Sequence, residues 1–189
     1  MDIIGFGRRD SATQSYLRAA LYGCMTGAFI EIGLPLSSCH IGDRGDGILV
    51  VAGIDISPEL LLRPLATELH ARIQQHNAMS IPAAEIRMRT AVNGGYVQMD
   101  THGVSGKAVV HLYRMLDAPP YKSAMEDSGA DLGLIISDHL YREVVQGPCR
   151  LKPLPFSELL IEVKETVATS WLWHTRVSSV LDGQPHQDA

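Results

Sequence analysis

The 189-residue chain lacks the features of an exported, membrane-spanning or nucleic-acid-binding protein. No uninterrupted apolar run approaches the roughly 20 residues that a membrane helix needs. No basic segment followed by an apolar one stands at its start, so we expect a cytoplasmic location. The formal net charge of −5 provides no electrostatic reason to bind nucleic acid or an anionic membrane. A small anionic ligand still fits this charge if a metal or a few local arginines carry the positive charge.

Cysteine is scarce as well. Cys24, Cys39 and Cys149 are an odd number without CxxC spacing, which argues against a disulfide framework and a structural zinc site. We expect reduced thiols packed in the interior. With 46% hydrophobic and 20% charged residues the composition is globular, and the length suits one domain. We predict a domain over residues 1–176 and a disordered tail over 177–189.

Helices are predicted where apolar residues recur every three or four positions between capping signals. The clearest stripe ends at Gly33, with Pro35 beyond it. Pro64 lies inside the second predicted helix and therefore predicts a kink or a late start. Ser105 is the expected N-cap of the third helix. The predicted helices are 17–32, 57–77, 105–116, a polar stretch after Pro120, and 137–145.

Strands are predicted where β-forming residues alternate between turn signals. Three glycines and two aspartates in the loop 42–47 suit a tight antiparallel hairpin, and Asn93-Gly94-Gly95 predicts a second one between 85–92 and 96–99. The order predicts an α+β fold: a ferredoxin-like or palm-type βαββαβ sheet with packed helices and further C-terminal αβ elements. The predicted strands are 2–7, 36–41, 48–52, 85–92, 96–99, 132–136, 158–163 and 169–173.

Two aspartates are the candidate metal ligands. Asp2 lies on the first predicted strand and Asp46 at the tip of the next hairpin, so neighbouring strands could bring their carboxylates together. Mg²⁺ takes one or two carboxylates plus phosphate oxygens, and two such ions can clamp a phosphoryl transfer. The turn Gly5-Phe6-Gly7 could present backbone N–H groups to phosphate oxygens. The alternative is that the aspartates only form turns.

Five short segments of the chain occur in a defined order. Asp2-Ile3-Ile4-Gly5-Phe6 follows the pattern Asp-Ile-x-Gly-Phe, and Gly45-Asp46 precedes an apolar strand. Next come a strand, glycine turn and strand (86–97), a helix ending in Arg-Met (106–115) and a serine-containing segment (136–141). In this order, from Asp2 to about Trp173, they resemble the catalytic domain of the class III nucleotidyl cyclases, the adenylate and guanylate cyclases. Because each motif is short, their shared order is the main argument.

The resemblance implies a homodimer that converts a nucleoside triphosphate into a 3′,5′-cyclic nucleotide and pyrophosphate. Asp2 and Asp46 would hold Mg²⁺ or Mn²⁺. Arg114 of the partner subunit would stabilise charge on the α-phosphate, although a solvated helix face is the alternative for this residue. Lys164 would substitute for a late phosphate-binding lysine of the family. The candidate nucleotide-binding residues are Ile3, Gly5, Phe6, Gly7 and Arg44.

Several positions depart from the family pattern. Val110 replaces the asparagine that family enzymes place four residues before the arginine, and only Met1 precedes Asp2. Gly42 and Gly103 fall on the base-selecting positions, so neither purine code is present. The base is then read by other groups, is a pyrimidine, or is no longer selected. Two hypotheses follow: an active cyclase of unknown base, or a catalytically inactive cyclase-homology domain that binds nucleotide or a partner protein in regulation.

Overall fold

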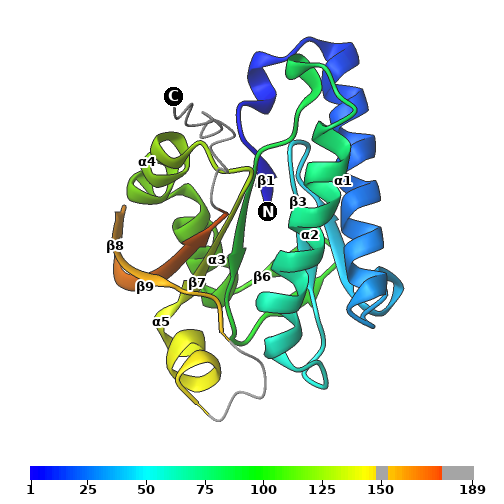
Figure 1. The fold of residues 1–189 in the computed structure, drawn as a ribbon. Helices are drawn as coiled ribbons and strands as arrows, with labels where there is room; N and C mark the ends of the chain where they lie inside the picture. Colours follow the sequence, from blue (N-terminus) through cyan, green and yellow to red (C-terminus); the bar gives the residue numbers. More distant parts are fainter. Residues whose placement is uncertain (148–152, 176–189) are drawn as a thin grey trace, which may run out of the picture.

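The structure is a computed structural model that describes residues 1–147 and 153–175. A mixed β-sheet forms the centre, with α1 (Ser11–Glu31) and α2 (Arg63–Asn77) on one face. The other face carries α3 (Lys107–Asp117) and α4 (Pro119–Ser128) (Figure 1). The predicted α+β fold is therefore confirmed. The predicted tail, residues 177–189, lies outside the described residues.

The main sheet has five strands in the order β1-β4-β7-β9-β8. The β4–β7 pair is parallel and the other pairs are antiparallel. Every residue of β7 is buried, as expected for a strand covered on both faces. The strands are β1 (Asp2–Ile3), β4 (Met88–Val92), β7 (Leu132–Ser137), β8 (Ser157–Val163) and β9 (Thr166–His174).

A β-hairpin of β2 (His40–Asp43) and β3 (Ile48–Val51) continues this sheet beyond β1. The Met1 nitrogen donates to Ile48 O at 3.1 Å, and Ile48 N donates back to Met1 O at 2.9 Å. Gly47 lies so close to this junction that a Cβ there would overlap Met1 O. Glycine is therefore required at this position, where the hairpin joins the first strand.

The helices begin and end close to their sequence signals. Asp10 caps α1 by accepting from Thr13 N at 2.9 Å. Pro64 falls in the first turn of α2, after a short 3₁₀ turn (Pro58–Leu61), which confirms the expected late start. The predicted polar helix after Pro120 is α4, and α5 (Asp138–Leu140) continues into a π-turn over Tyr141–Val145.

Three local predictions were wrong. Asn93-Gly94-Gly95 is not a hairpin turn, because β1 and β7 already occupy both edges of β4. The segment after β4 instead forms its own hairpin, β5 (Gln98–Asp100) with β6 (Gly103–Ser105). Ser105 consequently lies in β6, and Gly106 is the N-cap residue of α3. The predicted strand 36–41 begins as a 3₁₀ turn (Leu36–Ser38), so β2 starts only at His40.

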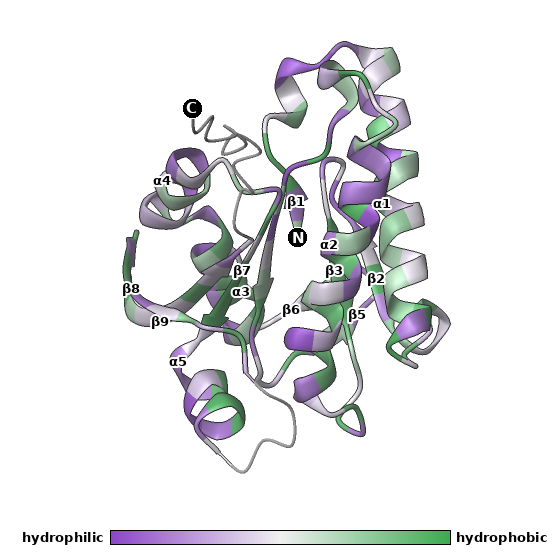
Figure 2. Cartoon of the chain, in the orientation of Figure 1, coloured by the Kyte–Doolittle hydropathy of each residue, from purple (hydrophilic) through white to green (hydrophobic). Residues whose placement is uncertain are grey.

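The core has one cluster of apolar side chains on each face of the sheet and a smaller third cluster near α5. In Figure 2, β3 is largely hydrophobic, as expected for a strand that contributes to the core. Hydrophilic and hydrophobic residues alternate along α2, which has one face on the sheet. Cys24 is a buried free thiol and Cys39 a half-buried one, as expected, while Cys149 lies outside the described residues. None of the helices in the described ranges is long and apolar enough to cross a membrane.

Candidate metal and nucleotide site

The fold brings Asp2 and Asp46 onto adjacent backbone segments. Ile3 N donates to the Asp46 carbonyl at 2.9 Å, and Asp2 forms a β-bridge with Gly47. Besides burial, which has the largest effect, the charge of Asp46 also raises the pKa of Asp2. The β-α-β-β order therefore brings the backbones of the two aspartates onto adjacent segments, and convergence of their carboxylates stays a prediction.

The two aspartates differ in environment. Asp46 is exposed, and its carboxylate accepts no hydrogen bond from any residue in the described ranges. The Asp2 side chain is only 15% exposed and forms an ion pair with Arg89, which is 13% exposed. Arg89 Nη2 lies 2.7 Å from Asp2 Oδ2, and Arg89 Nε lies 3.1 Å from Asp2 Oδ1. Burial raises the pKa of Asp2, and Arg89 opposes that shift.

Arg89 was not predicted from the sequence as part of the site. It is the direct cross-strand partner of Asp2 in the β1–β4 ladder, and opposite charges at such positions attract. The two residues are 87 positions apart in the chain. The pairing could therefore be found only once the strand register was known.

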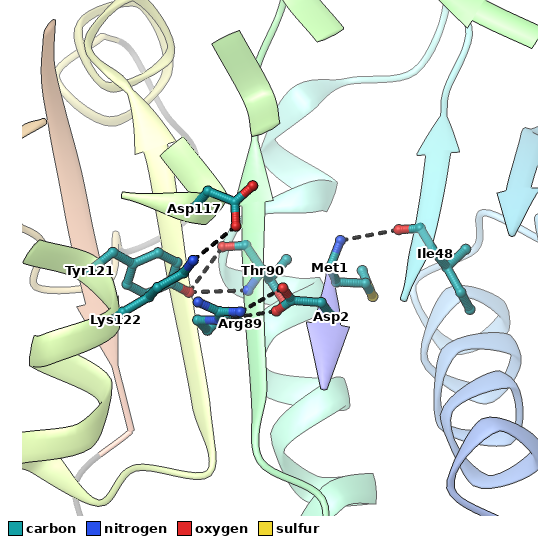
Figure 3. Close-up of polar contacts among 8 residues, drawn as sticks. All are labelled: Met1, Asp2, Ile48, Arg89, Thr90, Asp117, Tyr121 and Lys122. Atoms are coloured by element: carbon teal, nitrogen blue, oxygen red, sulfur yellow. Dashed lines mark hydrogen bonds and ion pairs between the residues drawn. The ribbon is translucent and has the colours of Figure 1, made fainter. Parts of the chain in front are cut away.

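The segment of β4 that carries Arg89 is held by α4. Tyr121 is completely buried, and its hydroxyl accepts from Thr90 N at 3.1 Å and donates to Thr90 O at 3.2 Å (Figure 3). Burial raises the pKa of this hydroxyl far above its usual range. Gly133, opposite Arg89 on β7, leaves the space for Tyr121, because a Cβ there would lie 2.8 Å from the Tyr121 hydroxyl.

The loop that carries Asp46 is anchored by its other aspartate, Asp43. Arg18 on α1 binds both Asp43 oxygens, at 3.1 and 2.5 Å, and also donates to Gly45 O. Tyr22 also donates to Asp43, at 2.8 Å, and Gly45 N donates to Asp43 at 2.7 Å. The hydrogen bonds from Arg18, Gly45 N and Tyr22 hold the pKa of Asp43 far below its usual range. Asp43 therefore anchors the loop to α1, whereas the Asp46 carboxylate has no hydrogen-bond partner among the described residues.

The predicted phosphate turn follows β1 directly. Gly5 has a φ of 71°, a left-handed conformation suited to glycine, and a 3₁₀ turn (Phe6–Arg8) begins after it. In the part of the chain that the structure describes, the N–H groups of Gly5, Phe6 and Gly7 make no hydrogen bond. Ile3 has a buried side chain, so only its backbone is available to a ligand.

Arg44 lies at the tip of the β2–β3 hairpin and reaches α3. Its guanidinium carbon is 5.6 Å from the ring centroid of Tyr113, within the range of a cation–π interaction. The two predicted base-selecting positions, Gly42 on β2 and Gly103 on β6, present no side chain. Selection of a base by side chains at those positions is therefore absent.

Arg114 and Lys164 lie together at another part of the molecule. Arg114, near the end of α3, donates to Glu165 at 2.8 Å in the turn between β8 and β9. Its side chain is 17% exposed, and its Nε is buried without a partner among the described residues. Lys164 occupies the same turn in a left-handed conformation, with a φ of 53°. No hydrogen bond or ion pair among the described residues joins Arg114 or Lys164 to Asp2 or Asp46.

The donor set suits a hard divalent cation. Within residues 1–147 and 153–175, no group of three or more histidine, cysteine, aspartate or glutamate side chains could hold a metal ion. Asp2 and Asp46 supply two carboxylates, and Mg²⁺ or Mn²⁺ would complete its coordination with water and phosphate oxygens. The residues present therefore fit a metal bound together with a triphosphate.

Comparison with known proteins gives the fold. No protein-family model and no curated protein sequence matches the chain. The catalytic core of a rhodopsin-guanylyl cyclase with converted specificity, in complex with ATPαS, has a TM-score of 0.54 at 19% identity, over 93% of this chain and 92% of that one. The guanylyl cyclase Cya2 has a TM-score of 0.57 at 16% identity, over 96% and 91%. The chain therefore has the fold of guanylyl cyclase catalytic cores, as the resemblance to class III cyclases led us to expect.

Proposed function

We propose that the protein is a nucleotidyl cyclase that converts a nucleoside triphosphate into a 3′,5′-cyclic nucleotide and pyrophosphate. The observation that carries the proposal is the backbone pairing of Ile3 with Asp46, which places the two aspartates on adjacent backbone segments of a cyclase-core fold. One of the similar structures was solved with ATPαS, a nucleoside triphosphate analogue.

In the proposed reaction the ribose 3′-oxygen forms a bond to the α-phosphorus. The bond between the α-phosphorus and the oxygen that bridges it to the β-phosphate breaks. Pyrophosphate leaves, and the hydroxyl proton passes to solvent. Asp2 and Asp46 would hold Mg²⁺ or Mn²⁺, which supplies Lewis-acid activation of the 3′-hydroxyl and neutralises phosphate charge. The free N–H groups of Gly5, Phe6 and Gly7 bind phosphate oxygens. We assign Arg44 to the same polyphosphate, and the exposed Lys164, which lies in the turn that binds Arg114, to the polyphosphate in the partner's site.

The proposal includes a symmetric homodimer with sites at its interface. Within one chain Arg114 pairs with Glu165 and makes no contact with the aspartates, so it would act on the partner's site, where its guanidinium stabilises the charge on the α-phosphate. Exposed apolar side chains occur on the same helix and in the segment before it: Val110 is 48% exposed, Tyr96 95% and Met99 56%. Such residues on α3, on β5 and just before β5 suit a subunit interface.

The base stays open in this proposal because both base-selecting positions are glycines. The test is to incubate the pure protein with Mn²⁺ and each of the four ribonucleoside triphosphates, and to separate the products by chromatography. We expect one cyclic product, and its loss in Asp46→Ala. Asp55→Ala is the matched control, because Asp55 is an exposed aspartate on a neighbouring loop. No cyclic product from any of the four would contradict the proposal.

A second candidate is a catalytically inactive module that binds nucleotide in regulation. It is favoured by the ion pairs that engage both Asp2 oxygens and the Arg114 guanidinium in one chain. Calorimetric titration separates the two candidates. Metal-dependent nucleotide binding without turnover supports the regulatory module, whereas turnover supports the cyclase.

A further inference from the structure

The Asp2–Arg89 pair is the most constrained ionic contact of the site. Its two hydrogen bonds, at 3.1 and 2.7 Å, run in parallel from one guanidinium to both carboxylate oxygens. Both side chains are largely shielded from water, and the register of β1 against β4 sets them directly opposite each other. This geometry gives the Asp2 carboxylate a single orientation.

Arg89 leaves Asp2 able to bind a further cation. An ionised carboxylate offers about four lone-pair sites, and the two bonds from Arg89 occupy two of them. A guanidinium that replaced a metal ion would be expected to bridge both carboxylates. In the described part of the chain Arg89 bonds to the Asp2 carboxylate, while that of Asp46 accepts no hydrogen bond.

The strand that carries Arg89 is held in place by contacts with α4 and β7. Tyr121 holds the next residue of β4 through two hydrogen bonds to Thr90. Gly133, the neighbour of Arg89 on β7, makes room for that tyrosine. The buried elements of the sheet and α4 thus determine where the guanidinium lies.

We propose that Arg89 is a positioning residue that holds the Asp2 carboxylate beside Asp46 for divalent-cation binding. The inference rests on the proposed function, which makes Asp2 and Asp46 the metal ligands. Outer partners of this kind orient metal-binding carboxylates, and their loss typically lowers metal affinity by about 10–100-fold. Lysine cannot replace arginine fully, because an ammonium lacks the planar pair of donors.

The test is binding of Mn²⁺ alone to the full chain. Binding is measured from the decrease in the electron paramagnetic resonance signal of free Mn²⁺. We expect Arg89→Met to weaken binding by about tenfold or more and Arg89→Lys to weaken it by several-fold. Arg87→Lys is the matched control, because Arg87 is a partly buried arginine next to β4 whose side chain, within the described residues, donates to backbone oxygens, Ala130 O and Met125 O. Its affinity should equal that of the wild type.

The conservative variant separates positioning from a merely structural role: Arg89→Lys keeps the positive charge but lacks the planar pair of donors, so it should melt close to wild type and still bind Mn²⁺ more weakly. A double variant then tests whether the two buried charges compensate each other. Asp2→Asn with Arg89→Met removes both buried charges, so its melting temperature should recover relative to Arg89→Met, while Mn²⁺ binding stays weak. Unchanged or tighter Mn²⁺ binding by folded Arg89→Met would overturn this inference but leave the proposed function standing. If the wild type binds Mn²⁺ no better than Asp46→Asn, the proposed metal site and this inference both fail.

Discussion

At the scale of single residues, the two candidate metal ligands have opposite relations to the fold. Asp2 is shielded and ion-paired with Arg89, whereas Asp46 is exposed and its carboxylate accepts no hydrogen bond from the described residues. Three residues before Asp46, Asp43 makes the contacts that hold the loop to α1. A shielded, ion-paired aspartate and an exposed one therefore lie on adjacent backbone segments of the sheet.

This difference predicts unequal effects on stability. Asp2→Asn leaves the Arg89 guanidinium without its anion in a shielded site, so we expect a loss of about 2 kcal/mol in the free energy of unfolding. Asp46→Asn should change it by less than about 0.5 kcal/mol. Urea denaturation of the two variants measures both effects. Equal losses would show that the environment of Asp2 differs from that described.

At the scale of secondary-structure elements, the packing of α4 against β7 depends on one glycine. In Gly133→Ala the new methyl group would overlap Met125 and lie 2.9 Å from the Tyr121 ring. We expect a loss of about 1–3 kcal/mol, typical of an overpacked core. Gly23→Ala is the matched control: it lies on the exposed side of α1 with no atom within 4 Å of the added Cβ, and should gain about 0.5–1 kcal/mol. Urea denaturation measures both variants. An unchanged free energy of unfolding for Gly133→Ala would contradict the described packing of α4 against β7.

The helix α3 carries a histidine whose burial links stability to pH. Burial lowers the pKa of His111 below the ordinary histidine value of 6.5, so the folded state disfavours the protonated ring. The stabilising contribution is complete above that value and is lost as pH falls through 6.5 towards the lower folded pKa. Compared with wild type, His111→Gln should lose less stability between pH 7 and pH 5. Urea denaturation at pH 7, 6 and 5 gives the comparison, and identical slopes would contradict it.

At the scale of the whole molecule, local signals predicted the elements better than their pairing. The apolar stripe ending at Gly33 and the glycine-rich loop 42–47 identified α1 and the β2–β3 hairpin, because both depend on neighbouring residues. The hairpin expected at Asn93-Gly94-Gly95 was wrong, since the partners of β4 come from distant parts of the chain.

The site followed the same rule. Asp2 and Asp46 could be predicted to converge from strand order alone, and the structure brings their backbones together. Arg89, Arg18 and Tyr121 could not be predicted, because their roles depend on register and on helix packing across long separations in the chain. The sequence also held no signal that Arg114 would pair with Glu165.

The central claim, a cyclase whose metal ligands and Arg114 come from different subunits, is tested most directly by mixing two variants. Asp46→Asn lacks a metal ligand and Arg114→Ala lacks the guanidinium, so each alone should form almost no cyclic nucleotide. In a mixed dimer one site combines the intact Asp46 and Arg114. Random pairing of equal amounts then predicts about a quarter of the wild-type activity on the preferred triphosphate. A mixture no more active than either variant alone, beside an active wild type, would contradict the account.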